Sequence, residues 1–217
     1  MTCLLVVAKA PVAGLAKTRL GAVIGHRQAA QVAAAALLDT LDAVLSVPSA
    51  IPVVALTGDL GAAERGAELA DVLGECVVIP QRGREFADRL ANAHADVASR
   101  FPERAVFQIG MDTPQLTGTL LAESITALHR PRVDAVLGPA ADGGWWGLGL
   151  RKPLHAMVLR LVPMSQADTG TRTLAALRRG GLRVGRLLEL SDVDTIADAM
   201  RVAATVPFGR FAQAVLA

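Results

Sequence analysis

The feature that most constrains the fold is a regular alternation between short apolar runs and longer segments whose apolar residues recur at helical spacing. Such alternation is typical of crossover units, in which a helix connects two parallel strands. Strands are expected at residues 3–8, 51–57, 76–79, 105–109, 134–137, 145–150 and 182–188. Helices are expected at residues 24–47, 61–73, 85–101, 117–129, 154–161, 171–179 and 196–206. The sequence therefore predicts a three-layer α/β/α fold with a mixed, mostly parallel sheet.

The chain is long enough for one such domain but not for two typical ones. Its 217 residues contain no internal repeat, no low-complexity segment and no linker that would divide them. We expect a single domain over residues 1–217, able to bury roughly 70% of its unfolded surface.

Composition excludes several classes of protein. The hydrophobic fraction is 52%, but Asp39 and Asp42 interrupt the alanine-rich stretch, and no segment supplies the ~20 apolar residues of a membrane span. No cleavable leader is apparent, so a cytoplasmic location is expected. A net charge of +2 gives no reason to expect nucleic-acid binding.

Cysteines and histidines offer no metal site or nucleophile. Both cysteines, Cys3 and Cys76, fall in predicted strands and are expected to be buried, inert thiols. The histidines lack the mutual spacing of metal ligands and are expected on the surface or on helix faces; they are His26, His94, His129 and His155.

The loop after the first strand has the composition of a phosphate-binding loop. Its small residues and glycine allow backbone N–H groups to approach an anion, and its cations can neutralise the charge. The residues expected to bind a nucleotide here are Lys9, Ala10, Pro11, Gly14, Lys17 and Arg19. Solvated surface charges are the alternative reading, but the position in the first strand-to-helix turn favours phosphate. The loop has neither the Walker nor the dinucleotide glycine spacing.

Polar residues also follow later strands. Gln81 and Gly83 come after the third predicted strand, Asp112 after the fourth and Asp142 after the fifth. Parallel strands bring such loops to the same edge of a sheet, where ligands of open α/β sheets bind. Asp112 can be a helix cap or turn residue, or an oxygen ligand for Mg²⁺ or Mn²⁺.

A second carboxylate for such a metal occurs near the C-terminus, where Asp192 and Asp194 precede Thr195. Magnesium is usually held by one or two carboxylates, with substrate phosphates and water completing its shell. Capping of the following helix by Asp194 or Thr195 is the alternative.

The segment Asp142-Gly143-Gly144-Trp145-Trp146 is the most unusual in the chain. Two glycines allow close approach of backbone to a ligand, and adjacent residues of a strand point to opposite faces. One tryptophan is therefore expected in the core, while the other can line a sugar or acceptor pocket. A tight turn with both rings used for packing is the alternative.

Taken together, these stretches resemble the nucleotide-diphospho-sugar transferase superfamily, whose Rossmann-like fold is called glycosyltransferase-A. More narrowly, they resemble the bacterial branch labelled radical-SAM/selenodomain-associated transferase. The matching segments run in order through nearly the whole chain: AKAPVAGLAKTRL at 8–20, QRGREFADRL at 81–90, IGMDTPQL at 109–116, LGPAADGGWWGLGL at 137–150 and SDVDTIADA at 191–199.

The resemblance implies roles for these residues. Lys17 and Arg19 would contact nucleotide phosphates, with Lys9 nearby, and Gln81 and Gly83 would lie near the base. Asp112 would be the metal-binding aspartate, with Asp194 as a second ligand, so the catalytic set is Lys17, Arg19 and Asp112. The chain departs from relatives in reading Gly110-Met111-Asp112 for Gly-Ser-Asp and Arg84-Glu85-Phe86 for Asp-Leu-Gly, and it lacks a full Asp-x-Asp.

The expected activity is transfer from an activated nucleotide to a small-molecule acceptor, with Mg²⁺ or Mn²⁺. We favour glycosyl transfer from a nucleotide-diphospho-sugar donor. Alternatives are a nucleotidyltransferase that joins an NTP to a phosphorylated or phosphonate acceptor with release of pyrophosphate, and a non-catalytic nucleotide-binding subunit.

Overall fold

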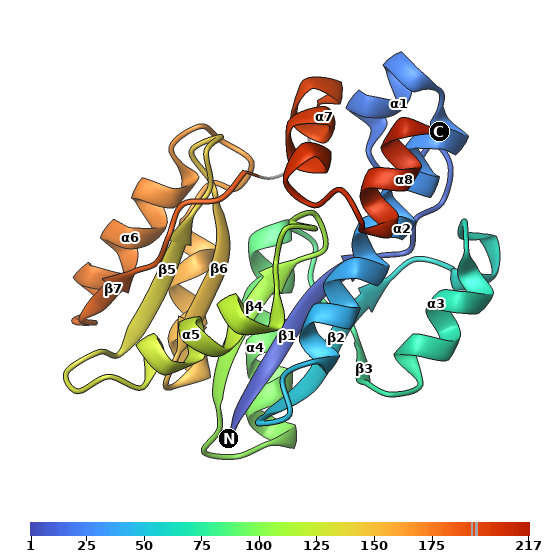
Figure 1. Cartoon of the computed structure of the whole chain (residues 1–217). Coiled ribbons are helices and arrows are strands. Elements are labelled where there is room, and N and C mark those ends of the chain that lie inside the picture. The colour runs from blue at the N-terminus through green and yellow to red at the C-terminus, as the bar shows by residue number, and fades with distance from the viewer. Residues whose placement is uncertain (192, 194) are drawn as a thin grey trace.

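The protein is built on a seven-stranded sheet in the order β3-β2-β1-β4-β6-β5-β7 (Figure 1). The computed structural model describes residues 1–191, 193 and 195–217. The strands are β1 (Thr2–Lys9), β2 (Ala50–Thr57), β3 (Val77–Pro80), β4 (Ala105–Gly110), β5 (Ala135–Pro139), β6 (Trp145–Leu150) and β7 (Val184–Arg186). Only β6 runs antiparallel to its neighbours, β4 and β5. The mixed, mostly parallel sheet is thus confirmed.

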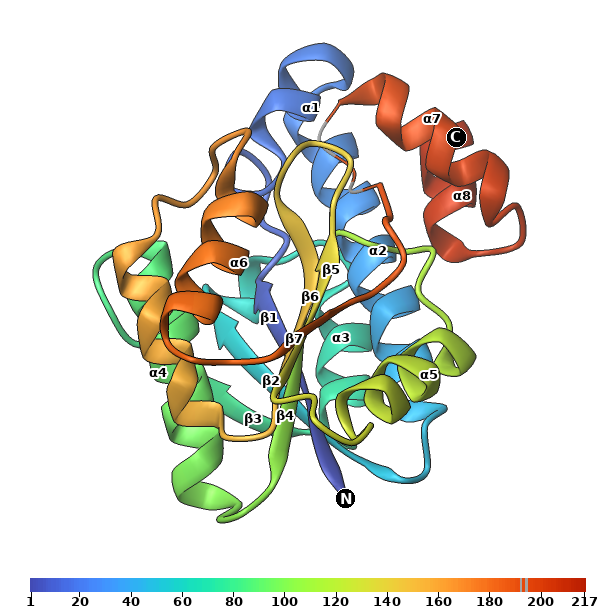
Figure 2. The ribbon, with the colours of Figure 1, turned by 90° about the vertical axis from the view of Figure 1, so that its left-hand side faces the viewer.

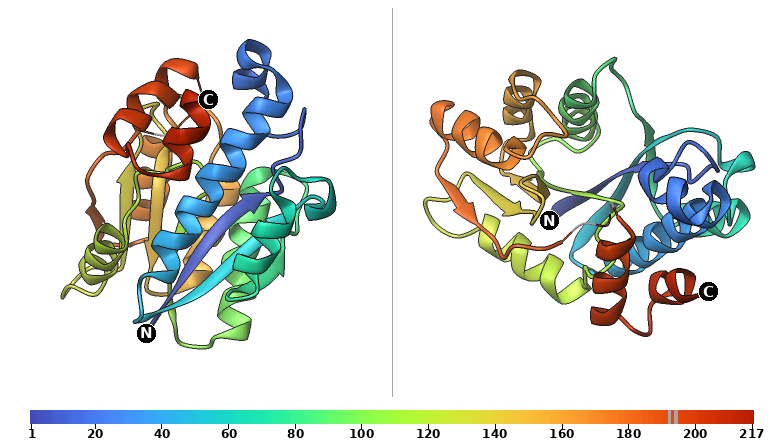
Figure 3. Two further views of the ribbon diagram at one scale, coloured as in Figure 1. Left: turned by 45° about the vertical axis from the view of Figure 1, so that its right-hand side comes forward. Right: turned by 90° about the horizontal axis from the view of Figure 1, so that it is seen from above.

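Helices cover both faces of the sheet, which produces the predicted three layers (Figures 2 and 3). One face packs against α2 (His26–Leu45), α3 (Gly66–Leu73) and α5 (Gly118–Leu128). The other packs against α4 (Phe86–Arg100), the 3-10 helix η2 (Pro153–Leu161) and α6 (Thr169–Arg179). The remaining helices are α1 (Thr18–Ile24), the 3-10 helix η1 (Leu60–Ala62), α7 (Ile196–Thr205) and α8 (Arg210–Leu216).

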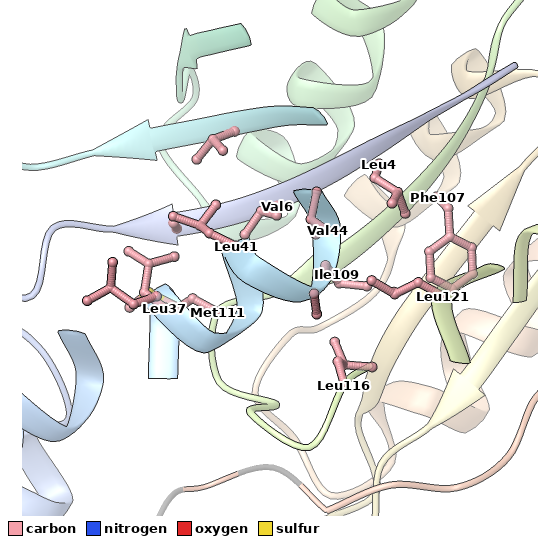
Figure 4. Packing of buried hydrophobic residues seen from close by; sticks show 14 of the residues in the cluster. Leu4, Val6, Leu37, Leu41, Val44, Phe107, Ile109, Met111, Leu116 and Leu121 are labelled. Atoms are coloured by element: carbon pink, nitrogen blue, oxygen red, sulfur yellow. The ribbon is translucent and has the colours of Figure 1, made fainter. Parts of the chain in front are cut away.

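The larger core lies between the sheet and α2. Leu4 of β1 and Phe107 of β4 belong to the same apolar cluster as Leu37 and Leu41 of α2, and each of these side chains is fully buried (Figure 4). Burial of one such side chain contributes about 1.5–3 kcal/mol. Because β1 and β4 pair in the middle of the sheet, this packing fixes the loops that follow both strands.

A smaller apolar cluster joins the two ends of the chain. Leu20 of α1 and Val32 of α2 pack with Val202 of α7 and Phe211 of α8. Figure 1 shows α7 and α8 beside α1, above the carboxyl ends of the strands. The C-terminal helices therefore support the loop that follows β1.

The helix expected at residues 24–47 is confirmed as α2, but a separate short helix, α1, precedes it. Gly25 adopts φ 90° and ψ 145°, ends α1 and precedes α2. A left-handed φ is incompatible with a continuous α-helix and favours glycine. The sequence pattern missed α1 and also α8.

Three smaller expectations had different outcomes. Thr117 is the N-cap of α5, where its side chain accepts a hydrogen bond from the Leu120 N–H, as predicted. Residues 153–161 form a 3-10 helix rather than an α-helix. Cys76 is wrongly placed in a strand: it precedes β3 and is only partly buried, whereas Cys3 is buried within β1. Burial raises the pKa of both thiols to about 11, which leaves them protonated at neutral pH.

Candidate functional site

A cleft of about 520 Å³ lies at the carboxyl ends of the central strands. Lys9 at the end of β1, Gln81 after β3, Asp112 after β4 and Asp142 in the β5–β6 loop all line it. The sequence predicted that the loops containing these four residues would lie at the same edge of the sheet. The parallel register of β1 with β2 and β4 brings them together.

Lys17 and Asp112 form the central ion pair of the rim, with 3.0 Å between Lys17 Nζ and Asp112 Oδ1. The Lys17 side chain is 8% exposed and the Asp112 side chain 43% exposed. Lys17 Nζ also donates a hydrogen bond to the carbonyl oxygen of Val193. The lysine therefore connects the loop after β1 with both the loop after β4 and the segment before α7.

Lys17 takes a left-handed backbone conformation, with φ 48° and ψ 48°, as the residue before α1. Gly14 has φ 78°, and a Cβ there would find no heavy atom within 4 Å. Lys9 Nζ donates a solvent-exposed hydrogen bond to the Leu15 carbonyl oxygen, at 2.9 Å. Ala10 and Pro11 are buried at the start of this loop, and Arg19 is exposed on α1.

The segment after β3 is held partly by hydrogen bonds to the neighbouring strands. Gln81 Nε2 donates to the carbonyls of Ala8 and Ala55, at 2.7 and 2.9 Å, and so joins the ends of β1 and β2. Gly83 has φ 129°, and a Cβ there would lie 2.6 Å from the Asp88 Cβ. Gly83 thus packs closely against the first turn of α4, whereas Gln81 joins the strand ends and lines the cleft.

The loop that contains Asp142, Gly143 and Gly144 forms a wall of the cleft. Asp142 Oδ1 accepts from the Gly144 N–H at 2.7 Å. Gly143 has φ 89°, and a Cβ there would lie 1.8 Å from the carbonyl oxygen of Ala167. The Gly170 N–H donates to the Gly143 carbonyl at 2.8 Å. The wall is therefore packed backbone against backbone.

One tryptophan is buried in the core and the other lines the cleft, as the alternation of side chains along a strand predicted. Trp145 is partly exposed and lines the cleft. Trp146 is 3% exposed, donates its indole N–H to the Leu188 carbonyl at 2.9 Å, and lies 6.0 Å from the Phe107 ring centroid. Only Trp145 is placed to touch a bound ligand.

The floor of the cleft contains functional groups that sequence reasoning missed. Gln108 of β4 is 2% exposed, and its Oε1 accepts from His94 Nε2 of α4 at 3.0 Å. Arg89 of α4 and the segment 164–166 with Thr169 also line the cleft. A polar residue inside the apolar run of β4 was the available signal for Gln108.

His94, expected on the surface or on a helix face, lies on the buried face of α4 and is not a surface residue. Burial lowers its pKa to about 4, while the hydrogen bond with Gln108 opposes that shift. The imidazole is therefore neutral at pH 7, and its Nε2–H serves as the donor to Gln108.

Asp112 is the carboxylate best placed to ligate a metal ion, because it is partly exposed, lines the cleft and lies beside Lys17. Among the described residues, no three His, Cys, Asp or Glu side chains gather into a metal site. Asp192 and Asp194, the second expected source of a ligand, lie outside the described residues. Thr195 caps α7 in a reciprocal capping box with Asp198.

Solved structures share this fold over essentially the full chain. A protein from Desulfovibrio desulfuricans G20, provisionally named a nucleotide-diphospho-sugar transferase, has a TM-score of 0.81 and 26% identity, covering 100% of this chain and 98% of its own. A 4-diphosphocytidyl-2C-methyl-D-erythritol synthase from Anaerococcus prevotii DSM 20548 has a TM-score of 0.60 and 13% identity, covering 95% of this chain and 99% of its own. CMP:2-keto-3-deoxy-manno-octonic acid synthetase complexed with CTP has a TM-score of 0.59 and 12% identity, covering 95% and 98%.

The architecture is therefore that of the nucleotidyltransferase and nucleotide-diphospho-sugar transferase class of α/β folds. Residues 40–166 match the model of the bacterial family described as "Uncharacterized protein conserved in bacteria (DUF2064)", and the chain belongs to that family. No curated protein matches the sequence. No helix in the described part of the chain is long and apolar enough to cross a bilayer.

Proposed function

We propose that this protein is a metal-dependent transferase that uses an activated nucleotide, and that its reaction is glycosyl transfer from a nucleotide-diphospho-sugar. The observation that carries the proposal is the ion pair of Lys17 and Asp112 at the cleft, 3.0 Å apart, with Lys9 lining the same cleft. Cations beside a half-exposed carboxylate suit a diphosphate that is bound together with a divalent ion. The 26% identity over the full chain to the Desulfovibrio desulfuricans protein supports the choice of donor.

Asp112 fits the requirement for a hard oxygen ligand. In the described part of the chain its carboxylate has Lys17 as its ion-pair partner and is 43% exposed, so it can accept a further bond from the cleft. Asp112 would hold Mg²⁺ or Mn²⁺ with substrate phosphates and water, and Asp194 is the proposed second ligand. When bound, the ion supplies positive charge that stabilises the departing diphosphate.

The chain's own groups would then divide the work of binding and catalysis. Lys9, Lys17 and Arg19 neutralise the diphosphate of the donor, and Gln81 and Gly83 border its base. Trp145, with Asp142 and the two glycines, offers a ring face and polar backbone to the sugar or acceptor. An acceptor oxygen attacks the anomeric carbon, the bond from that carbon to the diphosphate breaks, and a nucleoside diphosphate leaves.

Nucleotidyl transfer is the second candidate. The basic loop suits a triphosphate, and residue 110 is glycine, so the strand β4 does not end in the Asp-x-Asp of many glycosyltransferases. The fold shared with cytidylyltransferases is consistent with this reaction. An oxygen of the phosphorylated or phosphonate acceptor would attack the α-phosphorus, the bond from that phosphorus to the oxygen bridging to the β-phosphorus would break, and pyrophosphate would leave. The two reactions therefore differ in their products.

A thermal-shift panel of nucleoside triphosphates and nucleotide sugars, each with and without Mn²⁺, tests the proposal. A ligand at 100 times its Kd should stabilise the protein by about 2.7 kcal/mol. Product analysis with the stabilising ligand then separates nucleoside diphosphate, from glycosyl transfer, from pyrophosphate. No Mn²⁺-dependent shift with any nucleotide would overturn the proposal.

Asp112→Asn should abolish the Mn²⁺-dependent part of the shift, because a neutral amide is a poor ligand for a hard cation. The matched control is Asp142→Asn, a carboxylate of the same cleft whose amide oxygen can still accept from the Gly144 N–H. It should retain the Mn²⁺ effect. Binding with Mn²⁺ but no turnover of any nucleotide would instead identify a non-catalytic nucleotide-binding subunit.

A further inference from the structure

Gln108 presents an unused hydrogen-bond donor at the floor of the cleft. The side chain is 98% buried by neighbours, with 2% exposed, yet it lines the cleft. Its Oε1 is occupied by His94 Nε2 at 3.0 Å, and within the described residues its Nε2 has no hydrogen-bond partner. Unlike Arg89 Nε, Gln108 Nε2 is not sealed from solvent, so a ligand or water in the cleft can accept its hydrogen bond. The hydrogen bond to His94 fixes the amide so that its NH₂ group, not its oxygen, is available.

Arg89 supplies a positive charge to the same cleft. Its guanidinium lies 5.6 Å from the centroid of the Phe86 ring, and its Nε is buried without a hydrogen-bond partner. In the described part of the chain no carboxylate lies within ion-pairing distance of it, whereas Arg82, before α4, and Arg160, of η2, pair with Asp96 and Asp88 of α4. The aromatic ring holds the guanidinium plane while its donors stay available.

The cleft brings these two donors together, because Arg89 and Gln108 both line it. Arg89 precedes His94, the partner of Gln108, by five residues on α4. It therefore lies about 7.5 Å nearer the amino end of the helix. Arg89 is in the first turns of a 15-residue helix, whose amino end favours a negative charge. The positive charge of Arg89 and the donor of Gln108 thus border the same cleft.

From this we infer that Arg89 and Gln108 form a subsite for an oxyanion of the acceptor, a carboxylate or a phosphate or phosphonate group. This inference rests on the proposed function, because a transferase is what requires an acceptor beside its donor. A guanidinium and an amide NH₂ can together bind two oxygens of one anionic group. The acceptor is then a small acid rather than a neutral sugar or alcohol, and Trp145 packs against the remainder of it.

The test uses NMR of the full-length protein and no nucleotide. The side-chain Nε–H resonance of Arg89 and the NH₂ resonances of Gln108 are assigned from the variants that lack them. Methylphosphonate, inorganic phosphate and acetate are titrated separately, so that the strongest binder identifies the anionic group. We expect saturable shifts of both resonances with at least one anion. Resonances that stay unchanged with all three anions would overturn the inference.

Three variants complete the test. Arg89→Gln should weaken the effect of the best anion on the Gln108 resonances by about tenfold or more. Gln108→Glu keeps an acceptor for His94 but presents a carboxylate, and should abolish the shift of Arg89. Arg160→Gln removes a charge of η2 that does not line the cleft and should change the affinity less than twofold. Equal weakening in Arg89→Gln and Arg160→Gln would overturn the subsite.

The nucleotide panel and the anion titration test the two proposals independently, so a negative result in one does not contradict the other. If no nucleotide binds but Arg89 and Gln108 respond to an anion, the proposed transferase is wrong and the anion subsite stands. If nucleotides bind with Mn²⁺ and these two residues do not respond, the transferase stands and the acid acceptor is wrong.

Discussion

The two loops that border the cleft differ in how tightly their glycines are packed. The loop of residues 10–17 has backbone hydrogen bonds and, at its end, the ion pair of Lys17 with Asp112, but the space around its Gly14 is open. The loop of residues 140–144 is held by backbone hydrogen bonds, including Gly170 N–H to Gly143 O, and a Cβ at Gly143 has no room. We therefore expect the first loop to adjust when a charged ligand binds, and the second to be a fixed wall against which a ligand packs.

Replacement of Gly143 by alanine should cause the largest loss of stability, because Gly143 lies in the tightly packed loop of residues 140–144. The new Cβ would lie 1.8 Å from the Ala167 carbonyl oxygen, and the backbone has φ 89°. The chain must shift to remove both the clash and the strain, which we expect to cost about 4 kcal/mol or more. The free energy of unfolding from urea denaturation measures this loss.

Gly14→Ala is the matched control on the other loop. It introduces the same methyl group at a similar φ of 78° but into open space. The conformational strain alone is expected to cost about 1–2 kcal/mol. Equal losses of stability in the two variants would contradict the distinction between the loops.

The stability of the folded protein should also fall in acid, because His94 of α4 is buried in its neutral form. Burial holds its pKa at about 4 in the native state, below the value of 6.5 for an unperturbed histidine. The unfolded state therefore takes up a proton first as the pH falls, and stability is lost between about pH 6.5 and pH 4. The loss attributable to His94 at pH 4 is about 3 kcal/mol.

Denaturation at a series of pH values measures that loss. His94→Gln keeps a donor that can reach Gln108 and has no titration in this range, so its stability should depend less on pH between 6.5 and 4. A wild-type protein with the same pH dependence as His94→Gln would show that the histidine does not contribute.

The comparison of the two loops also separates what the sequence could reveal from what it could not. Strand β1 and the rim position of Asp112 were predictable because apolar runs and the carboxyl-end rule are local or topological features. The orientation of Lys17 toward Asp112 and Val193 was not, because it depends on how segments distant in the chain pack. Gln108 was missed for the same reason: its neighbour His94 belongs to another element, and neither residue forms a spaced motif with the other.

The smallest effect should come from Lys17→Met, which tests how the adjustable loop is held. Methionine keeps the length of the side chain but removes the ion pair with Asp112 and the hydrogen bond to Val193. The lost contacts are worth about 1–2 kcal/mol, so amides of residues 16–20 should exchange hydrogen roughly tenfold faster. Lys9→Met is the control, because it removes an exposed bond to Leu15 and should change exchange less than about threefold. Amides of residues 140–144 should be unaffected in both variants, since none of their hydrogen bonds involves Lys9 or Lys17. If exchange in that wall accelerates as much as in the loop after β1, the two sides of the cleft open together and are not independent.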